Sequence, residues 1–321
     1  MEAVIAEAGQ PLVMGSADRP AVGASDVLIE VKAAGLNRAD LMQRAGAYPP
    51  PPGASDILGL EAAGLIVEVG SDVTEWTVGD RVCALLTGGG YAEFAVTDAG
   101  SCFAVPESMS FADAACLPEA MMTVWANAFM RGNVASGQSF LMHGGTSGIG
   151  VMGIQMARHV GAGPIFATAG SDEKVQVCNE LGADHAINYR TQDFVEVVSA
   201  NGGADVILDM VGGDYVQRNI DAANLNGRIC NIAYQNGFEA TINFGPVLMK
   251  RLILTATTLR ARTAAEKRAI RDDVASMFWG AVESGEIRPV LDSTFAMTDA
   301  EQAHERLEAG GHIGKIVLTR D

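Results

Sequence analysis

Short runs of alternating apolar and polar residues occupy the first third of the chain. Residues 27–33 (VLIEVKA), 65–69 (LIVEV) and 91–96 (YAEFAV) alternate as half-buried strands do. Residues 78–82 (VGDRV) predict a turn that leads into another strand. Many short strands separated by glycine turns are typical of a partly closed barrel, so this part of the chain is predicted to be β-rich.

The pattern changes at about residue 112. Residues 112–129 are rich in Ala and Met and predict helix, interrupted at Pro118. Beyond them strands and helices alternate. The predicted strands are residues 139–143, 165–169, 185–189, 206–210, 228–233 and 252–259, and the clearest helices are residues 149–160 and 172–181. Alternation with nearly continuous apolar strands predicts a parallel sheet covered on both faces, and six strands make a full doubly wound (Rossmann) fold.

The last segment departs from this alternation. It contains a charged helix (residues 264–283), a helix near residues 299–309 and a final strand at residues 315–318. Because the sheet is already complete, we expect this segment to return to the first domain. The prediction is an α/β protein with a Rossmann domain (residues 123–262) inserted into a β-rich, partly open barrel (residues 1–122 and 263–321).

Composition narrows the class of protein. The formal net charge is −17, which opposes binding to nucleic acid or to an anionic membrane surface. The five cysteines include no C-x-x-C pair, and the five histidines are scattered, so neither a disulfide framework nor a metal site is predicted. A cluster of basic residues, interleaved with acidic ones, predicts a solvated helix face; it comprises Arg260, Arg262, Lys267, Arg268 and Arg271.

Two segments bear on location. The N-terminal residues carry Glu2 and Glu7 and no basic region, unlike a secretory signal. Residues 139–157 are uncharged and nearly long enough to span a membrane, but His143 and several glycines favour a strand, a turn and a helix. We therefore expect a cytoplasmic protein with no membrane partner.

The most informative motif is the glycine loop Gly148-x-Gly150-x-x-Gly153, between a predicted strand and a predicted helix. In this context the first glycine is expected to permit a tight turn, the second to let the backbone approach a pyrophosphate, and the third to allow close helix–strand packing. Free amides at the helix start would face the phosphates. The predicted cofactor-binding residues here are Gly145, Ser147, Gly148, Ile149 and Gly150.

The choice between NAD and NADP is made at the end of the second strand, where NAD enzymes usually place an acidic residue. This chain instead has Gly170 and Ser171 there, followed by Lys174, and Tyr189 and Arg190 end the next strand. A hydroxyl, an amine and a phenol suit a 2′-phosphate, so Ser171, Lys174 and Tyr189 are predicted to bind NADPH. Asp172 is the competing feature, because an inward-pointing Asp172 would suit NADH.

Four motifs together resemble one family. They are residues 37–64 (NRADLMQRAGAYPPPPGASDILGLEAAG), the glycine loop, GS-x-x-K at residues 170–174, and the terminal GKIVL at residues 314–318. The chain resembles, over essentially its whole length, the zinc-independent quinone oxidoreductase (zeta-crystallin-like) branch of the medium-chain dehydrogenase/reductase superfamily. Within that branch it is most similar to the stress-inducible NADPH quinone oxidoreductases. The resemblance implies that the β-rich domain is of the GroES-like type.

The resemblance also implies the loss of the zinc site. Asn37 occupies the place where zinc-dependent members put a cysteine, and Gly59-Leu60-Glu61 replaces their Gly-His-Glu. A leucine cannot ligate zinc. The structural zinc lobe would fall at residues 86–91, where a short glycine turn remains.

In the resembled family, residues matching Asn37 and Thr123 approach the nicotinamide, the residue matching Tyr48 lies over the acceptor, and the residue matching Lys315 reaches the cofactor. Tyr48 and Asn37 are thus the candidate catalytic residues, to orient and polarise the acceptor. The alternatives are a rigid proline loop with Tyr48 as an aromatic anchor, and a solvated strand position for Lys315.

The function expected on this basis is metal-free transfer of hydride or electrons from NADPH to a small planar quinone, which gains aromaticity and needs little acid catalysis. An NADPH-dependent enone or alkenal double-bond reductase is the alternative enzyme, in which a proton donor matters more. A non-catalytic NADPH-binding structural protein is the alternative outside enzymes. The apolar last strand, residues 252–259, predicts a homodimer through the sheet edge.

Overall fold

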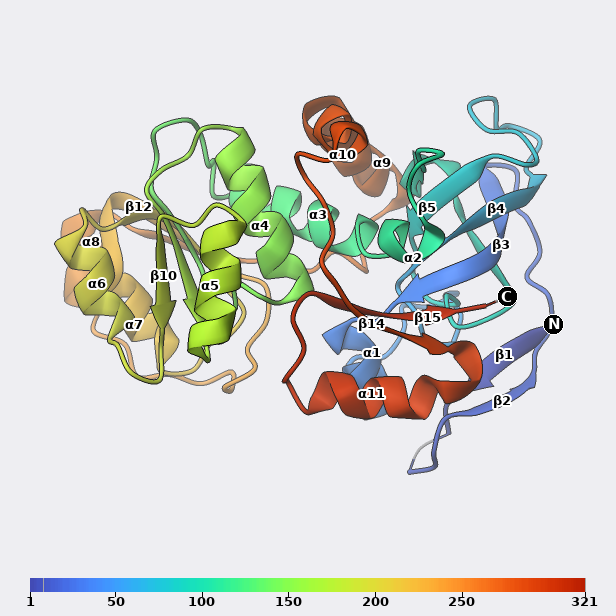
Figure 1. The fold of residues 1–321 in the computed structure, drawn as a ribbon, viewed down its shortest axis with the longest axis horizontal. Helices are drawn as coiled ribbons and strands as arrows, with labels where there is room; N and C mark the ends of the chain where they lie inside the picture. The colour runs from blue at the N-terminus through green and yellow to red at the C-terminus, as the bar shows by residue number, and fades with distance from the viewer. Residues whose placement is uncertain (8, 321) are drawn as a thin grey trace. The chain divides into compact units, whose positions relative to one another are not determined.

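The computed structural model describes residues 1–7 and 9–320; Ala8 and Asp321, both inside the predicted barrel domain, lie outside the described residues. The chain divides into two compact units (Figure 1). The first unit contains Met1–Ala120, Arg260–Ser284 and Arg288–Asp321, and the second contains Met121–Leu259 and Gly285–Ile287. The predicted boundaries followed residues 122 and 262, so residues 121, 122, 260–262 and 285–287 are assigned differently.

The second unit is built on one parallel sheet of six strands in the order β10-β9-β8-β11-β12-β13. The strands are β8 (Phe140–Met142), β9 (Ile165–Ala169), β10 (His185–Asn188), β11 (Ala204–Asp209), β12 (Ala223–Asn231) and β13 (Ile253–Ala256). This is the order of a dinucleotide-binding fold, with its switch point between β8 and β11. The prediction of a six-stranded doubly wound sheet is confirmed.

Helices cover the sheet because its strands are apolar on both faces. They are α4 (Gly148–His159), α5 (Asp172–Glu180), α6 (Phe194–Ala200), α7 (Tyr215–Ala222) and α8 (Phe244–Lys250); α3 (Pro118–Val124) and the π-helical turn η2 (Trp125–Phe129) precede β8. Phe194 and Ile220 of α6 and α7 join strand residues such as Leu141 in one buried cluster on one face. Figure 1 shows α4 and α5 side by side on the face nearer the viewer.

The first unit is formed by a mixed sheet, in which β14 and β15 pair in parallel and the other strand pairs are antiparallel. Its strand order is β14-β15-β3-β4-β5-β7, and β6 also pairs with β3. The strands are β3 (Asp26–Gly35), β4 (Glu61–Val69), β5 (Arg81–Leu85), β6 (Phe94–Asp98), β7 (Cys102–Ala104), β14 (Leu291–Ala296) and β15 (Lys315–Thr319), beside a small sheet of β1 (Glu2–Ile5) and β2 (Val13–Ser16). β6 pairs with Asp26–Glu30 of β3, whereas β15 pairs with Ala33–Gly35, so β3 serves two partners along one edge. This arrangement matches the expected barrel-like domain.

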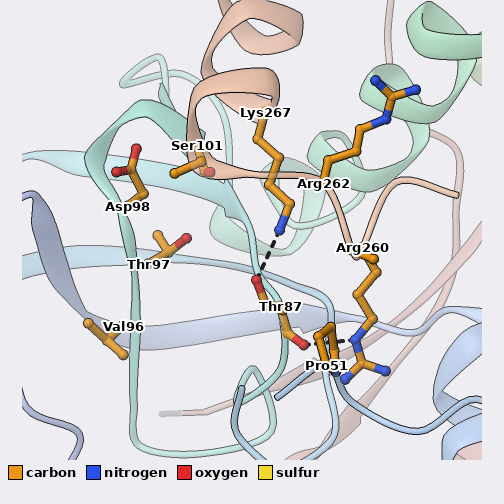
Figure 2. Close-up of a pocket in the computed structure, with 11 residues that line it drawn as sticks. Pro51, Thr87, Val96, Thr97, Asp98, Ser101, Arg260, Arg262 and Lys267 are labelled. Carbon is orange, nitrogen blue, oxygen red and sulfur yellow. Dashed lines mark hydrogen bonds between the residues drawn. The ribbon is translucent and has the colours of Figure 1, made fainter. Parts of the chain in front are cut away.

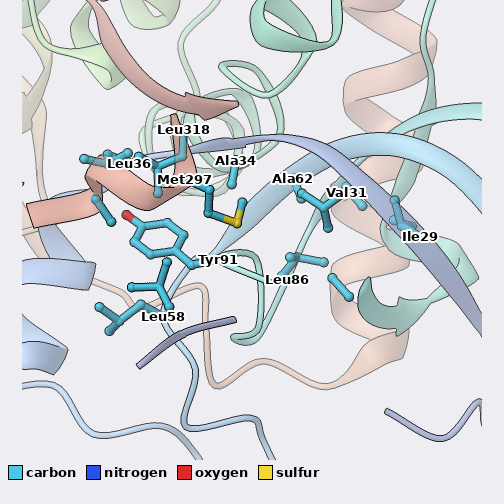
Figure 3. Packing of buried hydrophobic residues seen from close by; sticks show 14 of the residues in the cluster. Ile29, Val31, Ala34, Leu36, Leu58, Ala62, Leu86, Tyr91, Met297 and Leu318 are labelled. Atoms are coloured by element: carbon cyan, nitrogen blue, oxygen red, sulfur yellow. The ribbon is translucent and has the colours of Figure 1, made fainter. Parts of the chain in front are cut away.

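The core of the first unit lies inside this curled sheet. Figure 3 shows Ile29, Ala62 and Leu318 from three strands packed with Tyr91 and Met297. The helices at its surface are α1 (Arg38–Arg44), α2 (Phe111–Ala114), α9 (Ala264–Val274), α10 (Gly280–Ser284) and α11 (Ala300–Glu308), with the short turns η1 (Ala99–Ser101), η3 (Ala275–Trp279) and η4 (Met297–Asp299). The predicted charged helix at residues 264–283 is confirmed as α9, η3 and α10 in succession. In the described chain, no helix has the length and apolar character needed to cross a membrane.

Candidate functional site

The turn that leads into α4 differs from the sequence prediction in one detail. Gly144 has a φ of +69°, in the left-handed region that favours glycine, and it follows His143, the first residue after β8. Gly148, expected to permit the tight turn, is instead the first residue of α4. The prediction for the first glycine of the motif was therefore wrong by four residues, because the turn is made by Gly144, in a pair of glycines that precedes the motif.

The remaining glycines are required for close packing. A Cβ on Gly150 would lie 2.2 Å from the carbonyl oxygen of Gly144, so a side chain there would push the helix off the loop. A Cβ on Gly153 would lie 3.0 Å from Met142 Sδ in β8, as expected for the glycine that packs helix against strand. A Cβ on Gly145 would lie 2.6 Å from Cys178 Sγ in α5.

The start of α4 presents unused hydrogen-bond donors. Ser147 caps the helix: its Oγ accepts from Gly150 N at 3.0 Å and donates to Gly144 O at 2.8 Å. The backbone amides of Gly148 and Ile149 have no acceptor among the described residues, and both residues are partly exposed. Two free amides at the positive end of a twelve-residue helix suit the pyrophosphate of a dinucleotide.

A buried polar network, which the sequence prediction missed, anchors the same edge of the sheet. His143 Nδ1 lies 3.1 Å from Thr168 Oγ1, and its Nε2 lies 2.7 Å from Asn219 Oδ1. Asn219 Nδ2 donates to Asp209 Oδ2 at 3.0 Å, which assigns Asn219 Oδ1 as the acceptor of the Nε2 proton. Burial lowers the pKa of His143, so the imidazole is neutral and fixed as one tautomer.

Asp209 ends β11 and fixes the loop at the switch point. Its carboxylate accepts from Val211 N at 2.6 Å and from Gly212 N at 3.3 Å, and also from Asn231 Nδ2 at 2.8 Å. Ligands of this fold bind outside the carboxyl ends of the strands. The network therefore fixes the backbone beneath the expected ligand site. In the sequence, this network could have been found from the polar residues that stand at the ends of consecutive apolar strands.

Ser171 and Tyr189, two of the residues predicted to bind the 2′-phosphate, lie where β9 and β10 end. A Cβ on Gly170 would lie 2.6 Å from Tyr189 Oη, so the phenol lies directly over this glycine. Ser171 caps α5 by accepting from Lys174 N at 3.3 Å. The Ser171 hydroxyl, the Tyr189 hydroxyl and the start of α5 therefore share the carboxyl edge of the sheet.

Asp172, the residue that competed for the assignment, is engaged elsewhere. Its Oδ1 accepts from Asn188 Nδ2 at 2.7 Å. Asn188 ends β10, and its Oδ1 accepts in turn from Arg190 N at 3.1 Å. The Asp172 carboxylate is thus directed to the end of β10 rather than to Gly170.

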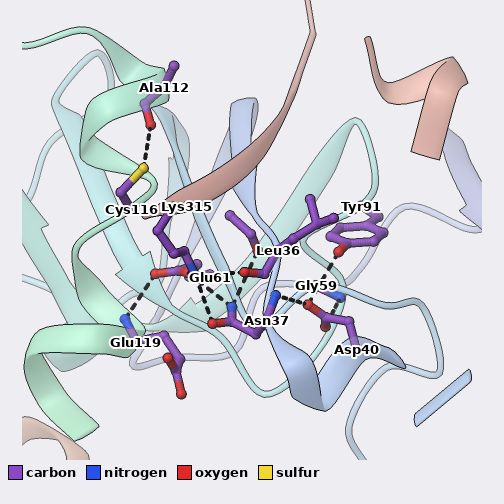
Figure 4. Close-up of polar contacts among 11 residues, drawn as sticks. Leu36, Asn37, Asp40, Gly59, Glu61, Tyr91, Ala112, Cys116, Glu119 and Lys315 are labelled. Atoms are coloured by element: carbon purple, nitrogen blue, oxygen red, sulfur yellow. Dashed lines mark hydrogen bonds and ion pairs between the residues drawn. The ribbon is translucent and has the colours of Figure 1, made fainter. Parts of the chain in front are cut away.

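In the first unit, Asn37 and Lys315 meet in a buried cluster (Figure 4). Lys315 Nζ donates to Asn37 Oδ1 at 2.7 Å and to Leu36 O at 2.8 Å, and it forms an ion pair with Glu61 Oε1. Asn37 Nδ2 donates to Glu61 Oε1 at 3.0 Å and to Gly35 O at 3.3 Å. Lys315 is buried and is not a solvated strand residue. Burial lowers the pKa of Lys315, but the charge of Glu61 more than offsets this effect, so the Lys315 ammonium stays charged.

Asp40 continues this cluster toward α11. Its carboxylate accepts from Asn37 N at 2.8 Å, Gly59 N at 3.1 Å and Tyr91 Oη at 3.2 Å, and Tyr91 Oη lies 3.3 Å from His304 Nε2. Burial raises the pKa of Asp40 to about 6. The backbone N–H of Asn37 is therefore bound by Asp40, while its side-chain amide is bound by Glu61 and Lys315.

Tyr48 is half-buried beside Arg260. The Arg260 guanidinium carbon lies 5.4 Å from the centre of the Tyr48 ring, and Arg260 Nη1 donates to Tyr48 O at 3.3 Å. Burial raises the pKa of Tyr48, so its hydroxyl is protonated at neutral pH. Tyr48 Oη has no partner among the described residues, which leaves a donor for a ligand.

Two further predictions concern Thr123 and the solvated basic helix face. Thr123 is buried in α3 of the second unit, where its carbonyl accepts from Asn127 Nδ2 at 2.9 Å. The predicted solvated basic face was wrong for Arg260 and Lys267, which are only 5% and 6% exposed. In the described residues, no group of three or more His, Cys, Asp or Glu side chains is arranged to hold a metal ion.

Comparisons with known proteins agree with this geometry. Residues 23–107 match the alcohol dehydrogenase GroES-like domain and residues 181–318 match the zinc-binding dehydrogenase family. The chain is 31% identical to a 2-haloacrylate reductase from Burkholderia sp, over 99% of this chain and 98% of that protein. It is 29% identical to the quinone oxidoreductase of Rattus norvegicus, with coverage of 93% and 90%. It is also 30% identical to a synaptic vesicle membrane protein VAT-1 homolog from Danio rerio, but it spans only 66% of that protein's length.

The chain is similar to solved structures of enzymes of both cofactor types, one complexed with NADPH and one NAD-dependent. The chain is similar to the Escherichia coli quinone oxidoreductase complexed with NADPH, with a TM-score of 0.86, 27% identity and 99% coverage of both chains. It is equally similar to an NAD-dependent alcohol dehydrogenase, with a TM-score of 0.86, 27% identity and full coverage of both chains.

A dinucleotide-binding unit combined with a GroES-like unit defines an oxidoreductase that uses a nicotinamide cofactor. The chain belongs to the medium-chain dehydrogenase/reductase superfamily.

Proposed function

We propose that this protein is an NADPH-dependent quinone oxidoreductase that works without a metal. The observation that carries the proposal is the unused Tyr48 hydroxyl beside Arg260, a protonated donor with no other group to bind among the described residues. A quinone oxygen needs one such donor and little further acid catalysis, because reduction makes the ring aromatic. The similarity to quinone oxidoreductases supports the same acceptor.

Preference for NADPH rests on the carboxyl ends of β9 and β10. With Gly170 where an acidic residue would select NAD, and with the Asp172 carboxylate held by Asn188, a 2′-phosphate would meet the hydroxyls of Ser171 and Tyr189 and the ammonium of Lys174. The free amides of Gly148 and Ile149 and the neighbouring Gly145, Ser147 and Gly150 would hold the pyrophosphate.

The bound cofactor supplies the hydride, and the protein supplies placement. Asn37 enters the proposal as a positioning residue, because both of its amide hydrogens already bind Glu61 and Gly35. Lys315 holds the Asn37 amide oxygen and would act on the nicotinamide side through Asn37. Thr123 is proposed to approach the nicotinamide. The side chains at the positions of the two family zinc ligands discussed above, Asn37 and Leu60, offer an engaged amide and a buried alkyl group, a donor set that does not suit zinc.

A second candidate is an enone or acrylate double-bond reductase, which the similarity to 2-haloacrylate reductase supports. In this reaction one carbon receives hydride and its neighbour receives a proton, for which Tyr48 is the available donor. Stopped-flow oxidation of NADPH and NADH with matched quinones and enones separates the candidates. Quinone turnover with NADPH supports the first proposal, enone turnover alone supports the second, and tight NADPH binding without turnover supports a non-catalytic protein.

We also propose a homodimer through the edge strand β13. The exposed apolar residues Phe244, Leu248 and Met249 of α8 lie close in sequence to Ile253 and Leu254 of β13, whose outer edge has no partner strand in the described chain. An apolar sheet edge can pair with its own copy about a twofold axis. Light scattering should give twice the 33.5 kDa chain mass for the wild type and the chain mass for Leu248→Glu with Ile253→Lys; a wild-type monomer contradicts the proposal.

A further inference from the structure

A small cavity lies within the first unit, beside the segment that leads into α9 (Figure 2). Its volume is about 220 Å³, enough for a substituent of a few heavy atoms but small for a whole ligand. Three cations, Arg260, Arg262 and Lys267, line it, together with Thr87, Thr97 and Asp98.

Two of these cations are buried without a carboxylate in contact, although the charge of Asp40 acts on Arg260 and that of Asp98 acts on Lys267. Lys267 Nζ donates to Thr87 Oγ1 at 3.0 Å, and this is its one acceptor among the described residues. Arg260 donates to Thr87 O at 2.8 Å, to Gln43 Oε1 at 2.8 Å and to Tyr48 O. Every acceptor is neutral, and neither cation takes part in an ion pair with a described residue. A buried charge of this kind is costly unless an opposite charge compensates it.

The remaining charges at the cavity are already engaged. Arg262 lies 3.9 Å from Glu266. Asp98 accepts from Gly100 N at 2.8 Å and lies 3.5 Å from Arg268. The Asp98 charge favours the ammonium of Lys267, whereas burial and the charge of Arg260 together lower the pKa of Lys267. Positive charge at the cavity therefore exceeds negative charge, in a chain whose formal net charge is −17.

Both cations keep donors that an oxyanion could use. An ammonium has three N–H groups and a guanidinium has five. Lys267 uses one of its donors and Arg260 uses three, so each has two left. Arg260 also packs against the Tyr48 ring, so one guanidinium separates the cavity from the residue proposed to orient the acceptor.

We propose that this cavity is an anion subsite, in which Lys267 and Arg260 bind a carboxylate or sulfonate substituent of the acceptor. The proposal rests on the proposed function only in making the acceptor the bearer of that substituent. The subsite would favour acidic quinones or unsaturated acids over neutral acceptors of the same size.

Calorimetry on the full chain tests the subsite without turnover. The probes are naphthalene-2-sulfonate and its neutral isostere naphthalene-2-sulfonamide, neither of which accepts hydride. We expect wild type to bind the sulfonate at least about tenfold more tightly, as one charge-assisted hydrogen bond provides. Lys267→Met should remove this preference, and Lys32→Met, at a lysine paired with Glu30 on the surface, should keep it.

Three results overturn the proposal: equal affinity of wild type for both probes, an unchanged preference in Lys267→Met, or binding of inorganic sulfate that naphthalene-2-sulfonate does not compete with. Thermal melting checks the variant, because replacing an uncompensated buried cation should leave the melting temperature equal or raise it. If Lys267→Met fails to fold, the wild-type probe pair still decides.

A kinetic comparison then separates the two proposals. The two substrates are 1,2-naphthoquinone-4-sulfonate and 1,2-naphthoquinone. The ratio of kcat/KM for the sulfonate to kcat/KM for the neutral quinone should fall at least about tenfold in Lys267→Met and remain unchanged in Lys32→Met. If wild type reduces neither quinone, the proposed function fails, while the calorimetric result for the subsite stands. If both quinones are reduced and the ratio is the same in all three proteins, the subsite fails alone.

Discussion

Lys315 Nζ lies 2.7 Å from Asn37 Oδ1, so the last strand of the chain holds the amide that begins α1. The same ammonium forms an ion pair with the fully buried Glu61. Removing Lys315 would leave that carboxylate without its counter-ion, so we expect Lys315→Met to lower the free energy of unfolding by about 3–5 kcal/mol. Urea denaturation of both proteins measures this change in the free energy of unfolding.

Lys32→Met is the matched control, because Lys32 pairs with Glu30 near the surface, where such a pair contributes about 0–1 kcal/mol. Similar losses in the two variants would contradict the role given to Lys315.

Gly150 leaves no room for a side chain, since a Cβ would lie 2.2 Å from Gly144 O. We expect Gly150→Ala to destabilise the protein by about 1–3 kcal/mol and to weaken dinucleotide binding, because the helix must move off the loop. Gly280 in α10 is a control, because a Cβ added there would have nothing within 4 Å. Gly280→Ala should stabilise by about 0.5–1 kcal/mol. Thermal melting and NADPH titration would show whether the two changes act in opposite directions.

Lys174 is expected to bind the 2′-phosphate of NADPH. Lys174→Met should raise the dissociation constant for NADPH about tenfold, as loss of one charge-assisted hydrogen bond predicts, and change that for NADH less than about twofold. Glu173→Gln, at the adjacent exposed position, should change neither. Fluorescence titration with both dinucleotides measures the constants, and an equal loss for NADPH and NADH would exclude this role.

Tyr48 is proposed to donate a hydrogen bond to the acceptor. Tyr48→Phe keeps the ring against Arg260 and removes only the hydroxyl. We expect kcat/KM for quinone to fall about 10- to 100-fold, as removal of one such donor often causes, while the NADPH dissociation constant stays within about twofold. Steady-state kinetics and titration on the same preparation compare the two. Equal losses in both would contradict the assignment.

His304 should make stability depend on pH. Burial lowers its pKa to about 4 from an ordinary 6.5, so its contribution is complete above pH 6.5 and is lost as the pH falls through about 4. Relative to His304→Gln, wild type should lose up to about 3 kcal/mol of unfolding free energy over that range. The raised pKa of Asp40 acts in the opposite direction, but Asp40 is present in both proteins and cancels. A difference that does not vary with pH would refute the expectation.

The sequence predicted the parallel sheet well because its strands are continuous apolar runs with clear boundaries. β9 has the predicted bounds at Ile165–Ala169, and α5 begins at the predicted Asp172 with Ser171 as its cap. The short helices α6, α7 and α8 were not predicted individually, because seven or eight residues are too few for the helical period to be distinguished.

Contacts between distant residues were beyond local patterns. Lys315 is separated from Asn37 by 278 residues and Arg260 from Gln43 by 217, and no local pattern reports these distances. Periodicity showed that Arg260 and Lys267 alternate with acids, which usually means exposure, but packing within the first unit buries both. The first-unit candidates Asn37 and Lys315 are brought together, whereas the role of Thr123 stays a prediction.

The central claim is that the amides at the start of α4 and the polar groups at the end of β9 bind a phosphorylated nicotinamide dinucleotide. Isothermal titration calorimetry of the purified chain with NADPH and NADH tests it most directly. We expect one NADPH per chain, bound more tightly than NADH. Absence of binding by both dinucleotides would contradict it.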